Sequence, residues 1–193
     1  MNIIKYLIFI FINLVVTNFR SCWQENYIPS RTELSKIYQK DYESLHPALK
    51  QAFSSGIKNV NDFANLYSRS QKNLLDSEIH QYYEKTHISM SLITYYSNMI
   101  GKKKSVMEVT RIIGIKNGIG TTIGISPYLR EMAIWNDSLV NQTLFSQTRT
   151  KQLIDNVFIP SFKRGDYFNG TKSGVTSIIK MIEYKYLTKK ESK

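Results

Sequence analysis

The run from Ile119 to Ser126 places the strongest constraint on how this chain can fold. It is rich in Ile and Thr and alternates poorly between apolar and polar residues, as is typical of a strand buried on both faces. Such a strand needs a layer of other elements on each side of its sheet. The clearest amphipathic helix, over residues 70–86, has an apolar face made of Leu74, Leu75, Ile79, Tyr82 and Tyr83. The sequence therefore predicts an open α/β sheet covered by helices on both sides.

Further short runs predict the other elements of this fold. Strands are expected over residues 57–60, 88–95 and 128–135. Helices are expected over residues 99–113, 147–158 and 166–186. Because the strand at 128–135 closely follows the break at Ser126-Pro127, we expect it to pair with the preceding strand in a hairpin. This hairpin would make a mostly parallel sheet mixed.

The stretch from Ile159 to Ile182 combines a helix break with a helix that carries two glycines. Pro160 is expected to end one helix, and Gly165 to form part of the turn before the next. Gly170 and Gly174 lie on one face of that second helix, although each glycine costs up to about 1 kcal/mol relative to alanine. Their presence predicts a close approach to another backbone, and we expect contact between this helix and the sheet.

The first 22 residues have the layout of a secretory signal. Lys5 lies near the start, an apolar run follows from Tyr6 to Val16, and polar residues come after it. The run has 11 residues, whereas a standard helix needs about 20 to cross a bilayer. We therefore expect an exported protein of the cell envelope, on the periplasmic or extracellular side.

The only cysteine of the chain, Cys22, follows this run, so no internal disulfide can form. A free thiol in an oxidising compartment needs a purpose, and lipid attachment supplies one. The stretch resembles the leader of a bacterial lipoprotein, in which Ser21 would be the small residue before the lipidated cysteine. Phe19 and Arg20 depart from the usual pattern. A cleaved leader without lipid and an uncleaved anchor stay open as alternatives.

The chain divides into four parts by composition and pattern. These are a leader or short anchor at 1–22, a helical extension or tether at 23–56, the compact domain at 57–187 and a basic tail at 188–193. In the extension, Leu34, Ile37 and Tyr38 have helical spacing, and Leu49 and Ala52 suggest a second short helix. We expect this segment to lie over the domain.

A strong positive charge bounds the choice of partners. The chain has 26 Lys and Arg against 15 Asp and Glu, a formal charge of +11, and loss of Lys5 and Arg20 with a cleaved leader would leave +9. Such a charge favours anionic lipids, other polyanions or acidic partners without deciding among them. A solvated basic surface with no partner is the simpler alternative. Finger spacing and aromatic RNA-binding patterns are missing from the sequence, so nucleic acid is not expected.

The sequence contains no familiar catalytic signature. It has no G-x-S-x-G elbow, P-loop, G-x-G-x-x-G or H-E-x-x-H motif, and its three histidines, His46, His80 and His87, are scattered. A site for a hard cation or phosphate could still be built from oxygen ligands at the carboxyl ends of the strands. The candidates are Asp62 after the first strand, Asn117 in the loop before the third and Asp137 after the fourth. Each also has a structural interpretation, because Asn and Asp commonly form turns and caps.

Three stretches carry a resemblance to a known family. They are VNDFANLYSRSQKNLLDSEIHQYYEKTHISMSLIT from Val60, GIKNGIGTTIGIS from Gly114, and IDNVFIPSFKRGDYFNGTKSGVTSIIKMI from Ile154. Together they resemble the TPM domain, a bacterial and plant family that includes a thylakoid-lumen acid phosphatase. The resemblance implies a three-layer α/β/α sandwich, export or membrane anchoring, and in some members calcium binding or acid phosphatase activity. It also matches Asp62 to the family's early aspartate and Asn117 to its Asn-Gly turn.

One segment departs from the family pattern. Family members commonly carry G-x-G-L-E-x-x-L-T-D after the fourth strand, where it supplies acidic groups to the site. The corresponding run here is WNDSLVNQTLFSQT, with Val140 in place of the glutamate and Phe145 or Ser146 in place of the aspartate. Calcium usually requires six or more oxygen ligands including several carboxylates, so this change is expected to weaken or abolish calcium binding, with Asp137 as a partial replacement.

These observations lead to three hypotheses. The first is an envelope-anchored TPM-domain protein that acts mainly as an interaction or assembly module for an unknown envelope protein. The second is a calcium-assisted acid phosphatase that uses Asp62, Asp137 and a bound cation. The third is a binder of anionic lipid or another polyanion through its basic surface.

Overall fold

The computed structural model describes residues 20–21, 41–56, 58–101, 104–118, 120–141 and 145–191. For residues 20, 21, 53, 97, 187 and 189–191 it describes the backbone alone. The apolar leader run, Cys22, the first half of the extension and the end of the basic tail lie outside the described residues. The expectations for those segments therefore stay predictions.

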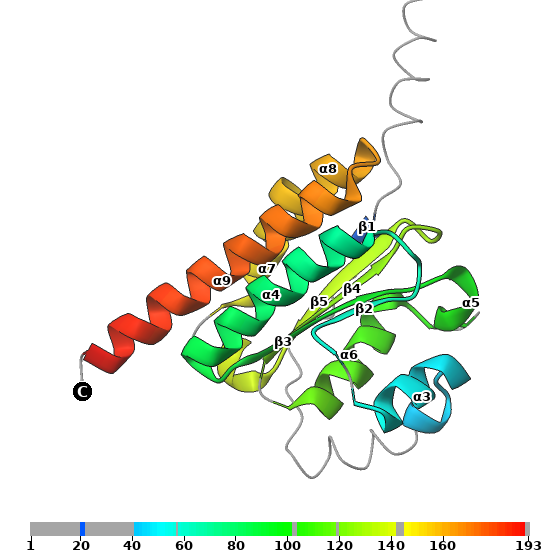
Figure 1. Cartoon of the computed structure of the whole chain (residues 1–193), viewed down its shortest axis with the longest axis horizontal. Coiled ribbons are helices and arrows are strands. Elements are labelled where there is room, and N and C mark those ends of the chain that lie inside the picture. The colour runs from blue at the N-terminus through cyan, green and yellow to red at the C-terminus, as the bar shows by residue number, and fades with distance from the viewer. Residues whose placement is uncertain are drawn as a thin grey trace, which may run out of the picture.

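A five-stranded mixed sheet forms the centre of the molecule, in the order β1-β5-β4-β3-β2 (Figure 1). Its strands are β1 (Arg20–Ser21), β2 (Val60–Asp62), β3 (Ser89–Thr94), β4 (Gly120–Ser126) and β5 (Glu131–Asn136). β2, β3 and β4 run parallel, and β5 returns antiparallel to β4. The predicted hairpin is thus confirmed, with residues 127–130 as its turn. The first predicted strand is displaced, since it covers residues 60–62 instead of 57–60.

Helices cover both faces of the sheet, which confirms the three-layer α/β/α arrangement. One face carries α4 (Arg69–Thr86), α7 (Gln147–Leu153), the π-helical turn η2 (Ile154–Phe158), α8 (Ile159–Lys163) and α9 (Tyr167–Glu191). The other carries α3 (Pro47–Ser54), α5 (Ser97–Ile100) and α6 (Val106–Asn117). Figure 1 shows α4 and α9 side by side on one side of the sheet, with α6 and α3 on the other.

The central strands contribute to two separate cores. Leu92 of β3 packs in the core under α4 and α9, and the next residue, Ile93, packs in the core under α6. Every residue of β4 is buried, as the poor alternation of its sequence predicts. Apolar burial on both faces of these strands is the main favourable contribution to a fold of this kind.

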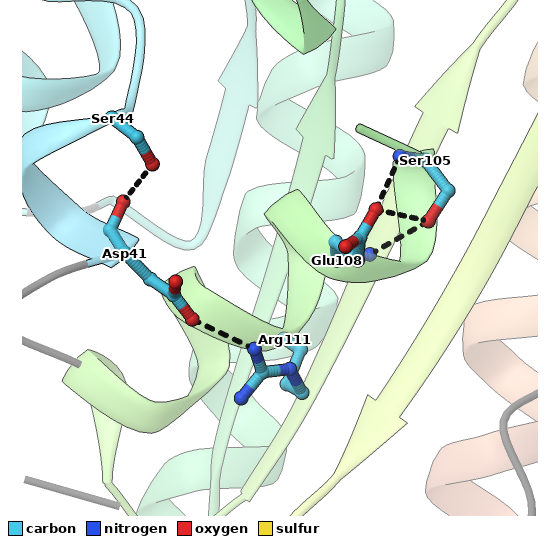
Figure 2. A network of polar contacts seen from close by, with 5 residues as sticks. All are labelled: Asp41, Ser44, Ser105, Glu108 and Arg111. Carbon is cyan, nitrogen blue, oxygen red and sulfur yellow. Dashed lines mark hydrogen bonds and ion pairs between the residues drawn. The ribbon is translucent and has the colours of Figure 1, made fainter. Parts of the chain in front are cut away.

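The part of the extension that the structure describes packs against α6. Leu45 and Leu49 are buried in the same core as Val109 of α6. Asp41 accepts a hydrogen bond from the Arg111 guanidinium at 2.9 Å, which forms an ion pair with α6 (Figure 2). The extension therefore covers the outer surface of α6 through both apolar and charged contacts.

The single helix expected over residues 99–113 is divided in the structure. α5 ends at Ile100, because Gly101 follows with a positive φ of 74°. α6 then starts after Ser105, whose hydroxyl accepts a hydrogen bond from the Glu108 N–H while the Glu108 carboxylate accepts one from the Ser105 N–H (Figure 2). This reciprocal capping is a strong helix start, so the prediction of one continuous helix is wrong.

The helix break expected at Pro160 is also wrong. The chain passes from α7 through η2 into α8 without leaving a helical path, and Pro160 lies in the first turn of α8. Pro160 has no N–H to donate within this run, and it lies just after η2, where the backbone bonding changes from the π-helical to the α-helical pattern. The break comes five residues later, at Gly165, which has a positive φ of 79°.

Gly170 and Gly174 make the predicted close contact, but with a different partner. A Cβ at Gly174 would overlap the ring of Phe158, and one at Gly170 would press on Ser161 and Phe162. These partners belong to η2 and α8, which lie beside α9 in the same helical layer. The expectation that these glycines mark contact with the sheet is therefore wrong, and they permit close packing between helices instead.

Replacement of Gly174 by leucine is expected to destabilise the fold. The new side chain would have to displace Phe158, which is fully buried, so the free energy of unfolding should fall by about 2 kcal/mol or more. Urea denaturation of Gly174→Leu checks this, with Ser173→Leu on the exposed side of α9 as the matched control. Equal stabilities of the two variants would contradict the packing role of Gly174.

Candidate functional site

Asp62 is the last residue of β2 and holds the turn that follows it. Its Oδ1 accepts hydrogen bonds from the Leu66 N–H at 2.9 Å and from the Thr94 hydroxyl at 2.6 Å. Its Oδ2 accepts one from the Tyr67 N–H at 3.0 Å. Thr94 in turn accepts the Ala64 N–H at 2.9 Å. Both carboxylate oxygens of Asp62 are thus engaged in positioning residues 63–67 at the carboxyl edge of the parallel strands.

Tyr67 ties this edge of the sheet to α9. Its buried hydroxyl lies 2.8 Å from the Thr171 hydroxyl, and its ring contacts Phe168 edge to face. Burial raises the pKa of Tyr67 far above its ordinary value; the hydrogen bond to Thr171 opposes this effect, and the charge of Asp62 adds to it. The hydroxyl is therefore neutral at physiological pH and serves as a structural bridge.

Asn117 and Asp137 lie at the opposite, amino edge of the parallel strands. Asn117 ends α6 just before β4, and its Nδ2 donates to the Ser91 hydroxyl at 2.9 Å. Asp137 follows β5, and its N–H donates to the Gly120 carbonyl at 3.0 Å. The expectation that both residues join Asp62 at the carboxyl edge of the parallel strands is wrong. A residue before a parallel strand lies at its amino end, and an antiparallel strand ends where its parallel neighbour begins.

Asp137 is half-buried and caps the turn after its strand. Its Oδ1 accepts the Val140 N–H at 2.8 Å. Burial raises the pKa of this carboxyl group, while hydrogen bonds with the backbone of Val140, Leu139 and Gly120 oppose the rise. This geometry agrees with the structural interpretation of Asp137 as a cap.

Tyr82 places a second polar group near Asp137. Its buried hydroxyl has no hydrogen-bond partner among the described residues. Burial raises the pKa of Tyr82; the nearby Thr86 hydroxyl partly offsets this, and the charges of Glu183 and Asp137 add to it.

Within the described part of the chain, no group of three or more His, Cys, Asp or Glu side chains could hold a metal ion.

The three histidines have separate environments. His46 Nδ1 accepts the Ala48 N–H at 3.2 Å, and its ring contacts Tyr96 edge to face. His80 is exposed on α4, and His87 caps the end of α4 with a positive φ of 54°. The structure does not bring them together.

Val140 and Phe145 are both 0% exposed and belong to the core beneath α4 and α9. The position where the family resemblance expects the glutamate is thus filled by an apolar side chain in the protein interior. Of the two positions that could correspond to the aspartate, Phe145 is also interior, whereas Ser146 is exposed and caps α7. Their burial follows from the sequence, because both are apolar residues in a segment that connects two packed elements.

Sequence reasoning missed Thr94 and Tyr67 as partners of Asp62. The sequence did indicate the hydrogen bonds from the backbone N–H groups to Asp62, because an aspartate that precedes a turn commonly accepts N–H groups a few residues later. The contact with Thr94 joins residues 32 positions apart and depends on the pairing of β2 with β3, which no local pattern records.

Comparisons with known proteins agree with this geometry. The model of the TPM domain family matches residues 60–181. The solution NMR structure of the N-terminal domain of a protein from P. gingivalis has a TM-score of 0.59 and 16% identity, and the match covers 68% of this chain and 85% of that one. The corresponding domain of a Corynebacterium glutamicum protein has a TM-score of 0.53 and 13% identity, with 65% and 80% covered. These likenesses concern the fold alone. No curated protein matches the chain.

The raised pKa of Asp137 leads to a prediction about stability and pH. The folded state retains a proton that the unfolded chain loses near the ordinary aspartate pKa of about 3.9. The resulting stabilisation is complete below that pH and disappears as the pH rises through the folded pKa. The asparagine of Asp137→Asn does not ionise, so the variant does not lose stability in this way as the pH rises. Its side-chain oxygen can still accept the Val140 N–H. The variant should therefore gain stability relative to the wild type between about pH 4 and pH 7.

Urea denaturation of both proteins across this range checks the expectation, with Asp76→Asn on the exposed side of α4 as a control for the lost carboxylate. A stability difference between wild type and Asp137→Asn that stays constant, or that shrinks with rising pH, would contradict it.

Proposed function

The chain belongs to the TPM domain family, and we propose that it is an envelope-anchored member that acts mainly as an interaction or assembly module. Its partner would be another protein of the cell envelope, and any hydrolase activity would be weak. The observation that carries this proposal is the complete burial of Val140 and Phe145.

A carboxylate at either position would lie among apolar side chains. Burial of an unpaired charge is so costly that the group either stays neutral or prevents folding. The segment after β5 therefore stabilises the domain where other members commonly carry acidic groups. This supports a protein that keeps the scaffold of the family and uses it for binding.

A calcium-assisted acid phosphatase is the alternative. It would need Asp62 and Asp137 to share a cation, together with enough other oxygens to complete six to eight ligands. Asp62 lies at the carboxyl edge of β2, and Asp137 follows β5 at the amino edge of β4. Both oxygens of Asp62 already accept hydrogen bonds from the turn and from Thr94. These contacts favour the interaction module over the phosphatase.

Anchoring is proposed from the leader sequence. The apolar run from Tyr6 to Val16 and the cysteine at Cys22 offer either an uncleaved anchor or a lipidated terminus. Among the described residues, no helix has both the length and the apolar character needed to cross a membrane.

Hydrolysis of p-nitrophenyl phosphate by the full chain, with and without calcium, tests the proposal. The expected result is turnover no faster than that of Asp62→Ala, together with no calcium binding by calorimetry at micromolar to millimolar levels. A robust, calcium-dependent rate that Asp62→Ala abolishes would establish the phosphatase and reject the module. The circular dichroism of Asp62→Ala should be recorded in parallel, because this variant also loses the contacts that hold residues 63–67.

A further inference from the structure

We propose that the carboxyl edge of the sheet is a membrane-facing surface that binds anionic lipid headgroups. We call it the basic rim and define it by the hairpin-turn residues Tyr128, Leu129 and Arg130, by Lys163 and Arg164 at the end of α8, and by Arg69 at the start of α4. This inference rests on the proposed envelope anchoring, in its form with an uncleaved anchor, and adds to it the orientation of the domain.

The backbone topology places the entry of the chain at this edge. β1 pairs in parallel with β5, and its first residue, Arg20, lies opposite Glu131. Glu131 directly follows the hairpin turn and pairs with Ser126 at the carboxyl end of β4. The apolar run from Tyr6 to Val16 therefore precedes a strand that starts beside the hairpin turn (Figure 1). An anchor in that run would bring this edge close to the bilayer.

The hairpin turn exposes an apolar pair beside a cation. Tyr128 is 63% exposed and Leu129 is 40% exposed, and both are among the large apolar residues that the described surface leaves open to solvent. Arg130 is exposed and has a positive φ of 53°. An aromatic ring, an aliphatic side chain and an arginine at one loop tip suit the boundary between headgroups and acyl chains.

Interactions between elements place the parts of the basic rim near one another. Burial raises the pKa of Tyr167 at the start of α9 and the charge of Arg130 lowers it, so the hairpin turn lies near that end of the helix. Tyr167 in turn contacts the Phe162 ring at 5.0 Å between centroids, next to Lys163 and Arg164. The contact between Tyr67 and Phe168 places Arg69 at the same edge.

The acidic groups at this edge are engaged in hydrogen bonds with the protein. Asp62 holds its turn, and Asp166 accepts bonds from the Asn169 N–H at 3.2 Å and the Asn169 amide at 3.0 Å. Glu131 accepts the Val106 N–H at 3.4 Å. These three carboxylates keep their charge but are half-buried, whereas the four cations of the rim are exposed. The side chains that extend into solvent are therefore mainly basic, which complements an anionic membrane.

Hydrogen exchange of the full chain on lipid vesicles tests the inference. The vesicles contain phosphatidylcholine alone or phosphatidylcholine and phosphatidylglycerol in equal parts. Exchange at residues 128–130 and 163–165 should slow by about tenfold on the anionic vesicles, and this protection should largely disappear in high salt. Residues 116–118, at the opposite edge of the sheet, should exchange equally on both.

Two matched double variants distinguish binding through the basic rim from attraction by the overall positive charge of the protein. Arg130→Glu with Lys163→Glu should abolish the protection, whereas Lys116→Glu with Lys180→Glu changes the net charge equally and should leave it intact. All four residues are exposed, so both variants are expected to fold. Tyr128→Ser should reduce the protection, and Tyr184→Ser, which removes a 71% exposed tyrosine near the far end of α9, should not.

Equal exchange on the two kinds of vesicle, or equal effects of the two charge variants, would overturn the inference. Equal protection by soluble polyphosphate would also overturn it, because charge alone would then suffice without a membrane.

The anchoring premise is an uncleaved anchor before β1, because cleavage before a lipidated Cys22 would remove β1 (Arg20–Ser21) and with it the entry of the chain at this edge. Its own readout is the mass of the membrane-bound protein, which should retain residues 1–21. A soluble wild-type protein would reject anchoring, while protection that requires phosphatidylglycerol would still support the rim. A membrane-bound protein without such protection would reject the rim alone.

Discussion

The burial of β4 on both faces is the constraint on which the rest of this structure depends. None of its seven residues is exposed, so two helical layers must cover it. β4 and α6 approach so closely that a Cβ at Gly124 would overlap the Thr110 hydroxyl of α6. α6 and the extension build one layer, and α4 with α7 to α9 builds the other. Within that second layer, Gly170 and Gly174 let α9 lie directly against η2 and α8.

Sequence patterns predicted the elements that depend on burial alone. The apolar face of α4 follows from helical periodicity, although Leu74 and Tyr83 of the predicted face are exposed. The buried strand β4 follows from its run of Ile and Thr, and the hairpin with β5 from the break at Ser126-Pro127. The divided helix over residues 99–113 did not, because apolar spacing continues through it while Gly101 and the Ser105 cap decide where the backbone turns. The path through Pro160 depends on a π-helical turn that apolar spacing does not reveal.

The candidate site was less predictable, for a geometric reason. Asp62, Asn117 and Asp137 were chosen as neighbours of strand ends, but the edge on which a residue lies depends on strand direction. Once β5 is antiparallel, Asp137 moves to the edge opposite Asp62. The contact between Asp62 and Thr94 likewise required the sheet register. The burial of Val140 and Phe145 could be expected from their apolar character. It shows that this segment packs into the core of the domain, where the family resemblance would expect acidic groups.

The central claim is that the segment after β5 contributes packing in place of an acidic site, and Val140→Glu tests it most directly. Unfolding of this variant in urea should show a loss of about 3 kcal/mol or more, and calcium should not restore it. Leu139→Glu, at the 44% exposed neighbouring position, should stay near wild type. A Val140→Glu protein as stable as the wild type, and further stabilised by calcium, would contradict the account.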